Sequence, residues 1–175
     1  MNTLIRILKH RWLDASDTRR AVPDDMAERL ARRVAASEER HCGEVRLCVE
    51  ASLPTSYLWR INARTPLATV VRERALAWFG RLRIWDTEHN NGVLIYLLLA
   101  EHAIEFVADR ALAQRVGQAE WQAIVDRLGT RLREGAFEDG LTQALEEVSA
   151  LLVLHFPAEA EKDRRNELAD SVVRR

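Results

Sequence analysis

Five residues with oxygen-bearing side chains are placed where they could bind a hard metal ion. Asp86, Glu88, Asn90 and Asn91 lie in one polar turn, and Asp109 ends the strand expected to return beside it. Carboxylate and amide oxygens are the ligands that Ca²⁺ and Mg²⁺ prefer. The spacing is not that of an EF-hand, and a polar turn before a buried strand often serves only to satisfy its own backbone. The sequence therefore offers a Ca²⁺ or Mg²⁺ site beside the simpler interpretation of a structural turn.

The same carboxylates indicate the kind of catalysis that the sequence leaves open. A divalent ion held by Asp86, Glu88 and Asp109 could support the hydrolysis of phosphoesters. Motifs for other reactions are missing, because the sequence has no Gly-rich phosphate loop, no Gly-x-Ser-x-Gly elbow and no His-Glu-x-x-His pair. His89 and His102 flank a predicted strand, whose length keeps them apart and disfavours a shared zinc site.

A second group of candidate residues lies in a long segment without periodicity, residues 52–65. Loops of this length often carry function. Tyr57, Trp59 and Arg60 combine two aromatic rings with a guanidinium group, and Trp59 is the tryptophan best placed for an exposed contact. We expect these three residues to bind a protein partner, whose identity the sequence does not give.

The first dozen residues have the pattern of a short basic amphipathic helix. Apolar residues alternate with basic ones, with Leu4, Ile5, Leu8 and Trp12 set against Arg6, Lys9, His10 and Arg11. Such a helix can lie on an anionic membrane surface or in a partner's groove. It can equally dock on its own domain through the same apolar face, so both interpretations stay open.

Composition excludes several classes of protein. The chain has 26 basic and 27 acidic residues, and its net charge of −1 provides no overall field to attract nucleic acid. The basic clusters are interleaved with acids, so we expect no nucleic-acid partner. The N-terminus shows no secretory signal, and the most apolar run, residues 92–100, is too short to cross a bilayer. We therefore expect a cytoplasmic protein, with the N-terminal helix as its route to peripheral contact with the inner face of the membrane.

Residue periodicity predicts one α/β domain, a short sheet covered by amphipathic helices. Strands are expected over residues 44–51, 93–99 and 104–108, and helices over residues 24–39, 65–82, 121–132 and 137–152. The first strand alternates, so that one face lies in the core and the other, with Arg46 and Glu50, does not. Residues 21–157 then form the domain, between a basic N-terminal segment, residues 1–20, and a charged tail, residues 158–175, predicted to be a frayed helix or disordered.

This order of elements resembles the TPM domain family, named for a thylakoid-lumen photosystem II repair protein. Its most specific part is Asn90-Asn91-Gly92 opening a long apolar strand, followed by a returning strand with Ile104-Glu105-Phe106-Val107. Trp121 and residues 137–145, with Gly135 and Gly140, resemble the closing helices of the family. The resemblance covers about residues 24–155 and implies a mixed sheet of about four strands sandwiched between helices, a three-layer α/β/α arrangement.

The resemblance implies several activities. Some members bind calcium, a phosphatase activity has been proposed for a plant member, and others act in membrane-protein maintenance or assembly. We therefore expect a non-catalytic binding or accessory module. The alternative is a divalent-metal-dependent hydrolase, phosphatase-like, that uses the polar turn.

Overall fold

The computed structural model describes residues 3–158 and 168–175, and its strands form one mixed sheet. The strand order is β3-β2-β1-β4. β1 (Val45–Glu50) pairs in parallel with β2 (Val93–Leu98) and with β4 (Val173–Arg174). β3 (Ala103–Ala108) runs antiparallel to β2, which confirms the predicted hairpin.

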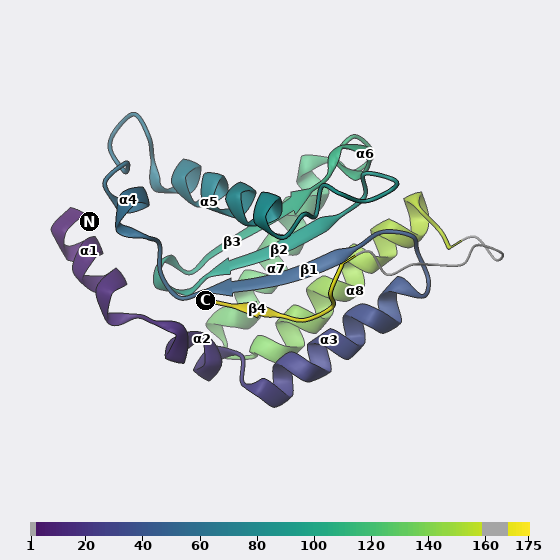
Figure 1. Cartoon of the computed structure of the whole chain (residues 1–175), viewed down its shortest axis with the longest axis horizontal. Helices are drawn as coiled ribbons and strands as arrows, with labels where there is room; N and C mark the ends of the chain where they lie inside the picture. The colour runs from purple at the N-terminus through teal and green to yellow at the C-terminus, as the bar shows by residue number, and fades with distance from the viewer. Residues whose placement is uncertain (1–2, 159–167) are drawn as a thin grey trace.

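Helices cover both faces of the sheet, which confirms the predicted three layers (Figure 1). α5 (Leu67–Arg81) lies on one face, and α3 (Asp24–Glu38), α7 (Gln118–Arg133) and α8 (Phe137–His155) lie on the other. Shorter helices occupy the N-terminal segment and the connections: α1 (Thr3–Trp12), α2 (Ala15–Ala21), α4 (Thr55–Leu58), the 3-10 helix η1 (Leu99–Glu101) and α6 (Arg110–Ala113).

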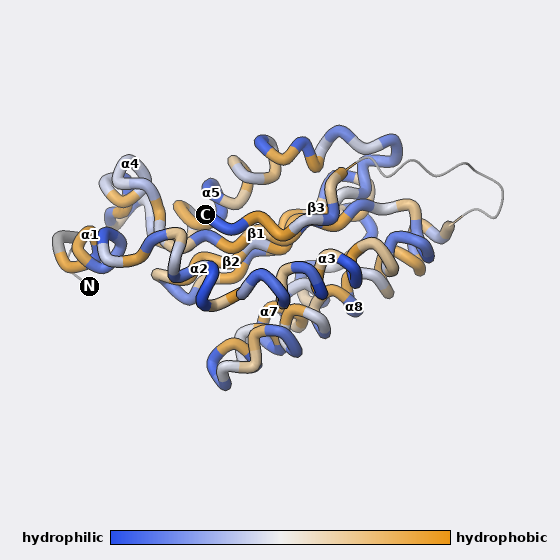
Figure 2. The backbone as a smooth tube through the Cα atoms, turned by 60° about the horizontal axis from the view of Figure 1, so that its bottom comes forward, coloured by the Kyte–Doolittle hydropathy of each residue, from blue (hydrophilic) through white to orange (hydrophobic). Residues whose placement is uncertain are grey.

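The alternation of side chains along the strands divides the core into two parts. Val45, Leu47 and Ile95 pack with α3, α7 and α8, whereas Cys48 and Tyr96 pack with α5. Every residue of β1 and of β2 is buried, and Figure 2 shows hydrophobic residues concentrated along these strands. The prediction that β1 leaves one face outside the core was therefore wrong, because α5 covers that face.

The two ends of the chain contribute more to the sheet than the sequence predicted. The tail was expected to be a frayed helix or disordered, but Val173 and Arg174 form β4 and Arg175 N donates to Val49 O at 2.9 Å. Residues 159–167 of that tail lie outside the described part of the chain. α2, within the segment expected to precede the domain, packs beside β1 and β4.

Several element boundaries also differ from the prediction. α3 follows Pro23 and α5 follows Pro66, and neither proline offers a side-chain cap, so α5 begins at Leu67, two residues later than expected. The segment of residues 52–65 is not wholly irregular, because α4 forms a single turn inside it.

Gly92 and Gly80 provide a matched pair of substitutions. A Cβ added at Gly92 would clash with the carbonyl oxygen of Ile84, whereas one added at Gly80 meets nothing within 4 Å. We expect Gly92→Ala to destabilise the protein by about 1–3 kcal/mol, because the backbone of the turn must shift. Gly80→Ala, inside α5, should stabilise it by about 0.5–1 kcal/mol. Chemical denaturation of both variants measures this, and equal effects would contradict the close approach at Gly92.

Candidate functional site

The polar turn of residues 85–92 and the start of α6 form one corner of the molecule. Asp109 N donates to Gly92 O at 2.8 Å, and Ala111 N donates to Asn90 O at 3.0 Å. Asn90 adopts a left-handed conformation with φ of 51°, which asparagine tolerates better than most residues. The backbone thus brings Asn90, Asn91 and Asp109 to the same corner, as the sequence predicted.

Some side-chain oxygens at this corner have hydrogen-bond partners and others do not. Asp109 Oδ1 accepts from Arg110 N at 2.7 Å and caps α6. Asn90 Oδ1 accepts from Arg110 Nη2 at 2.7 Å, and Asn91 Nδ2 donates to Cys42 O at 3.1 Å. Two buried oxygens, Asn91 Oδ1 and Asp109 Oδ2, have no hydrogen-bond partner among the described residues. These hydrogen bonds join the turn to α6 and to the backbone at Cys42.

The acidic side chains of the predicted metal site are not gathered into one ligand set in the described part of the chain. Asp86 and Glu88 are exposed, and within residues 3–158 and 168–175 no three His, Cys, Asp or Glu side chains could hold a metal together. The Arg110 guanidinium lies 3.8 Å from Asp109 Oδ1 and places a positive charge among the donors. The metal site of Asp86, Glu88, Asn90, Asn91 and Asp109 stays a prediction, and so does the hydrolase that would depend on it.

The residues predicted to bind a partner differ in how much surface they offer. The Tyr57 ring lies near two guanidinium groups, with Arg60 Cζ at 5.4 Å and Arg74 Cζ at 5.2 Å from its centroid. Arg60 is also paired with Glu73 of α5. Trp59, directly after α4, is 65% exposed. Tyr57 and Arg60 thus hold the segment of residues 52–65 in place, and Trp59 presents the free surface.

A buried polar network that the sequence did not predict is centred on Glu50. Its carboxylate accepts from Arg74 Nε at 3.0 Å, Trp78 Nε1 at 3.0 Å and the Tyr96 hydroxyl at 2.6 Å. Burial, with the Glu50 carboxylate beside it, raises the pKa of the Tyr96 hydroxyl, so that it stays protonated and donates. Glu50 in an alternating strand and Arg74 on an apolar helix are the signal in the sequence, but the alternation alone places Glu50 outside the core.

Helix α1 docks on the domain mainly through polar groups. Arg6 Nε donates to Glu101 Oε1 at 3.0 Å, and His10 Nε2 lies 2.9 Å from the same oxygen. Leu53 N donates to His10 Nδ1 at 2.9 Å, so Nδ1 is the acceptor and Nε2 carries the proton given to Glu101. All three side chains of this cluster are largely buried.

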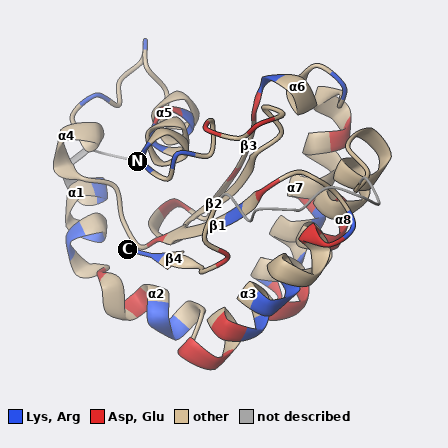
Figure 3. Ribbon diagram, turned by 45° about the vertical axis from the view of Figure 1, so that its right-hand side comes forward, with Lys and Arg blue, Asp and Glu red and all other residues tan. Residues whose placement is uncertain are grey.

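The apolar stripe of α1 faces outward. Ile5 is 58%, Leu8 57% and Trp12 84% exposed, whereas Ile7 packs against the core beneath α5. The helix therefore does dock on its own domain, but not through the apolar face that the sequence analysis considered. Figure 3 shows basic residues on this helix as well. No helix within the described residues is long and apolar enough to cross a membrane.

A cluster of acids lies where α3 meets the edge of β1. Glu38 Oε1 accepts from Val45 N at 2.9 Å. Burial, reinforced by the nearby Glu44 and Asp170 carboxylates, raises the pKa of Glu38 from 4.5 to about 8. Glu38 is therefore largely protonated at neutral pH in the folded protein.

Sequence comparison identifies the protein family to which this chain belongs. The chain matches the TPM domain over residues 16–151, and it belongs to the TPM domain family. No curated protein matches the chain. Among solved structures, the chain is similar to the BA42 protein of the psychrophilic bacterium Bizionia argentinensis, determined by NMR, with a TM-score of 0.70 and 22% identity. The match covers 87% of this chain and 94% of BA42 and shows that the fold is shared.

Glu38 makes the stability of the protein depend on pH. Folding raises the pKa of Glu38. The stability that this group contributes is therefore fully present below about pH 4.5 and is lost as the pH rises through about 8. Glutamine does not ionise, so we expect Glu38→Gln to keep its stability as the pH rises. At pH 8 its free energy of unfolding should exceed that of the wild type by about 2 kcal/mol. Urea denaturation between pH 5 and pH 9 measures it. Glu39→Gln, at an exposed neighbouring position, is the control, and parallel pH profiles for all three proteins would contradict the assignment.

The position of Arg110 makes divalent-ion binding at the polar corner testable. Since its guanidinium lies among the candidate donors, we expect the wild type to bind Ca²⁺ and Mg²⁺ only weakly, with Kd above about 1 mM. Arg110→Ala should bind at least about tenfold more tightly, since the repelling charge is gone. Calorimetric titration measures both. Asp109→Asn in the Arg110→Ala background keeps a side-chain cap on α6 and should abolish the gain in affinity. Tight binding by the wild type would contradict the role of Arg110.

Proposed function

We propose that this TPM-domain protein is a non-catalytic accessory module that attaches reversibly to an anionic membrane surface through α1. One observation carries the proposal: α1 is fixed by its polar side, so its apolar stripe points away from the domain. An amphipathic helix that served only to complete the core would bury that stripe. The outward stripe instead favours a contact outside the molecule.

The docking of α1 prepares the stripe for binding. Glu101 accepts from both Arg6 and His10, and His10 is tied to the backbone at Leu53. Charge-assisted hydrogen bonds of this kind, sheltered from water, are stronger than ordinary ones. The helix is therefore already formed and oriented, so less conformational entropy is lost when it binds.

The chemistry of the exposed side suits a lipid surface. Ile5, Leu8 and Trp12 form an apolar stripe, and Lys9 and Arg11 lie beside it along the helix. Tryptophan favours the interface between headgroups and acyl chains, and basic residues near an anionic leaflet contribute about 1 kcal/mol each. α1 packs on α4, and exposed Trp59 follows α4 directly. A stripe this short binds lipid weakly, which supports reversible attachment.

The accessory role follows from combining this surface with the rest of the molecule. The carboxylates Asp86, Glu88 and Asp109 are not gathered into a ligand set in the described part of the chain. Trp59 offers a protein partner an exposed ring next to the membrane-binding helix. In this proposal the protein works on the cytoplasmic face of a membrane, in the maintenance or assembly of a membrane protein.

Vesicle sedimentation tests the proposal. We expect the wild type to sediment with vesicles of phosphatidylcholine and phosphatidylglycerol, and much less with phosphatidylcholine alone. Leu8→Ser combined with Trp12→Ala should weaken binding about tenfold or more, because both side chains leave the contact. The melting temperature should change by less than about 2 °C, since both positions are exposed.

The matched control lies on another helix. Leu154 on α8 is 71% exposed, so Leu154→Ser also removes an exposed leucine but leaves α1 intact. This variant should sediment like the wild type. Failure of the wild type to bind anionic vesicles, or equal binding by the α1 variant, would contradict the proposal.

A further inference from the structure

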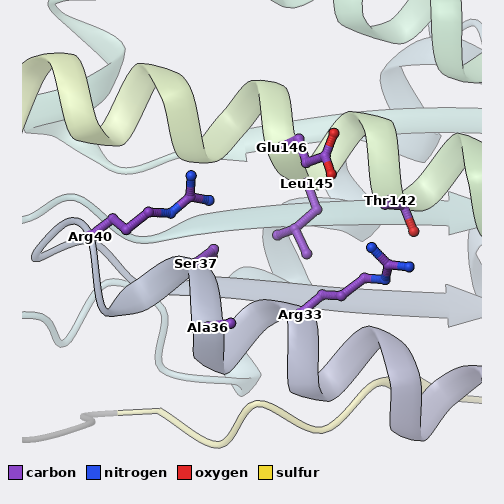
Figure 4. Close-up of a pocket in the computed structure, with 7 residues that line it drawn as sticks. All are labelled: Arg33, Ala36, Ser37, Arg40, Thr142, Leu145 and Glu146. Atoms are coloured by element: carbon purple, nitrogen blue, oxygen red, sulfur yellow. The ribbon is translucent and has the colours of Figure 1, made fainter.

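We infer that the hollow between α3 and α8 binds a small hydroxylated organic anion, a phosphate or a carboxylate. This hollow, of about 290 Å³, is lined from both helices (Figure 4). Arg33, Ala36, Ser37 and Arg40 line it from α3 and the turn that follows, and Thr142, Leu145 and Glu146 line it from α8. The volume lies at the lower end of the range for small-molecule sites.

The hollow results from short side chains on α3. Ala36 and Ser37 face α8, and neither side chain is long enough to fill the space between two packed helices. Leu145 is buried and forms an apolar wall. Arg33 and Ser37 lie four residues apart on one side of α3, and Arg40 lies in the turn that follows.

Thr142 supplies a hydroxyl group that has no partner. Its Oγ1 is buried and makes no hydrogen bond within the described part of the chain. A threonine inside a helix can donate to the carbonyl four residues earlier, and Thr142 does not do so. In Figure 4 Thr142 and the Arg33 side chain approach each other across the hollow, so an oxyanion between them would accept from both.

The two arginines retain hydrogen-bonding capacity. Arg33 makes no hydrogen bond or ion pair among residues 3–158 and 168–175. Arg40 Nη2 donates to Ser149 Oγ at 3.1 Å, and a guanidinium has further N–H groups to offer. Neighbouring arginines of α3 differ, since Arg29 is paired with Glu138 and Arg32 with Glu28. Arg33 is thus the arginine of α3 that keeps a free guanidinium group among the described residues, and it lines the hollow.

Charge and hydrogen bonding together define the ligand. The lining contains two arginines, Arg33 and Arg40, and one acid, Glu146, which is an excess of one positive charge among the lining residues. Guanidinium groups match the oxygens of phosphate and carboxylate groups. Ser37 Oγ donates to Val34 O at 2.9 Å, so it can only accept from a ligand, as Glu146 does. A ligand with an anionic group for the arginines and hydroxyl groups for Ser37 and Glu146 satisfies both sets.

This site is separate from the proposed membrane contact. α1 lies at the opposite end of the molecule from most of α3 and α8 in both Figure 1 and Figure 2. A soluble ligand can therefore reach the hollow whether or not α1 is bound to lipid, and the failure of either proposal leaves the other standing.

Titration of the ¹⁵N-labelled full-length protein tests the inference. The probes are inorganic phosphate, glycerol 3-phosphate and acetate, each added at constant ionic strength. We expect saturable amide shifts at residues 33–40 and 142–149, with glycerol 3-phosphate binding more tightly than inorganic phosphate. If acetate matches phosphate, the site recognises carboxylates as well. Arg33→Gln and Thr142→Val should each weaken binding at least about fivefold.

Two further variants separate this site from general attraction between charges. Arg32→Gln removes the adjacent arginine, which lies outside the hollow, and should leave the affinity unchanged. Glu146→Gln removes the only acid in the lining and should tighten binding of inorganic phosphate. The inference is overturned if no probe gives a saturable shift, or if Arg32→Gln weakens binding as much as Arg33→Gln.

Discussion

The buried carboxylate of Glu50 is the constraint on which much of this structure depends. An ion withdrawn from water costs several kcal/mol unless partners surround it, and Glu50 finds them on two elements, Arg74 and Trp78 on α5 and Tyr96 on β2. α5 must therefore cross the sheet with Arg74 above the end of β1. Arg74 also lies against Tyr57, which fixes the segment of residues 52–65. The backbone N–H of Leu53, in that segment, donates to His10 of α1. The position of α1 therefore depends on the Glu50 carboxylate as well.

The sequence predicted the elements that have strong periodicity and missed those that depend on a partner. The apolar run of residues 93–99 and the long helical stripes identified β2, α5, α7 and α8 without reference to neighbours. β4 has two residues among charges, and its pairing energy comes from the open edge of β1, so nothing in its own sequence indicates a strand. The alternation in β1 was correctly recognised, but Arg46 and Glu50 were placed outside the core. A pattern of residues cannot show that α5 covers Glu50 or that Asp170 lies near Arg46.

The candidate sites were predictable to different degrees. The polar turn and Asp109 were recognised as neighbours, because a hairpin brings the two ends of its strands together. What the sequence could not show was Arg110 folding back onto Asn90, since a side-chain rotamer decides it. For α1 the periodicity identified the stripe of Ile5, Leu8 and Trp12, but not which side would pack. Glu101, far along the chain, decides that orientation. No pattern in the sequence predicts the hollow between α3 and α8, because it arises where two short side chains lie between a pair of packed helices.

The parallel pairing of β4 with β1 has a consequence for the order of events during synthesis. β1 is among the first parts of the sheet to leave the ribosome, whereas the residues that cover its outer edge are residues 173–175. Until they are made, that edge exposes unpaired backbone groups of the kind that recruit strands from other chains. The sheet can therefore be completed only after translation has passed Arg174, and a chain stalled before that point would keep an edge prone to aggregation.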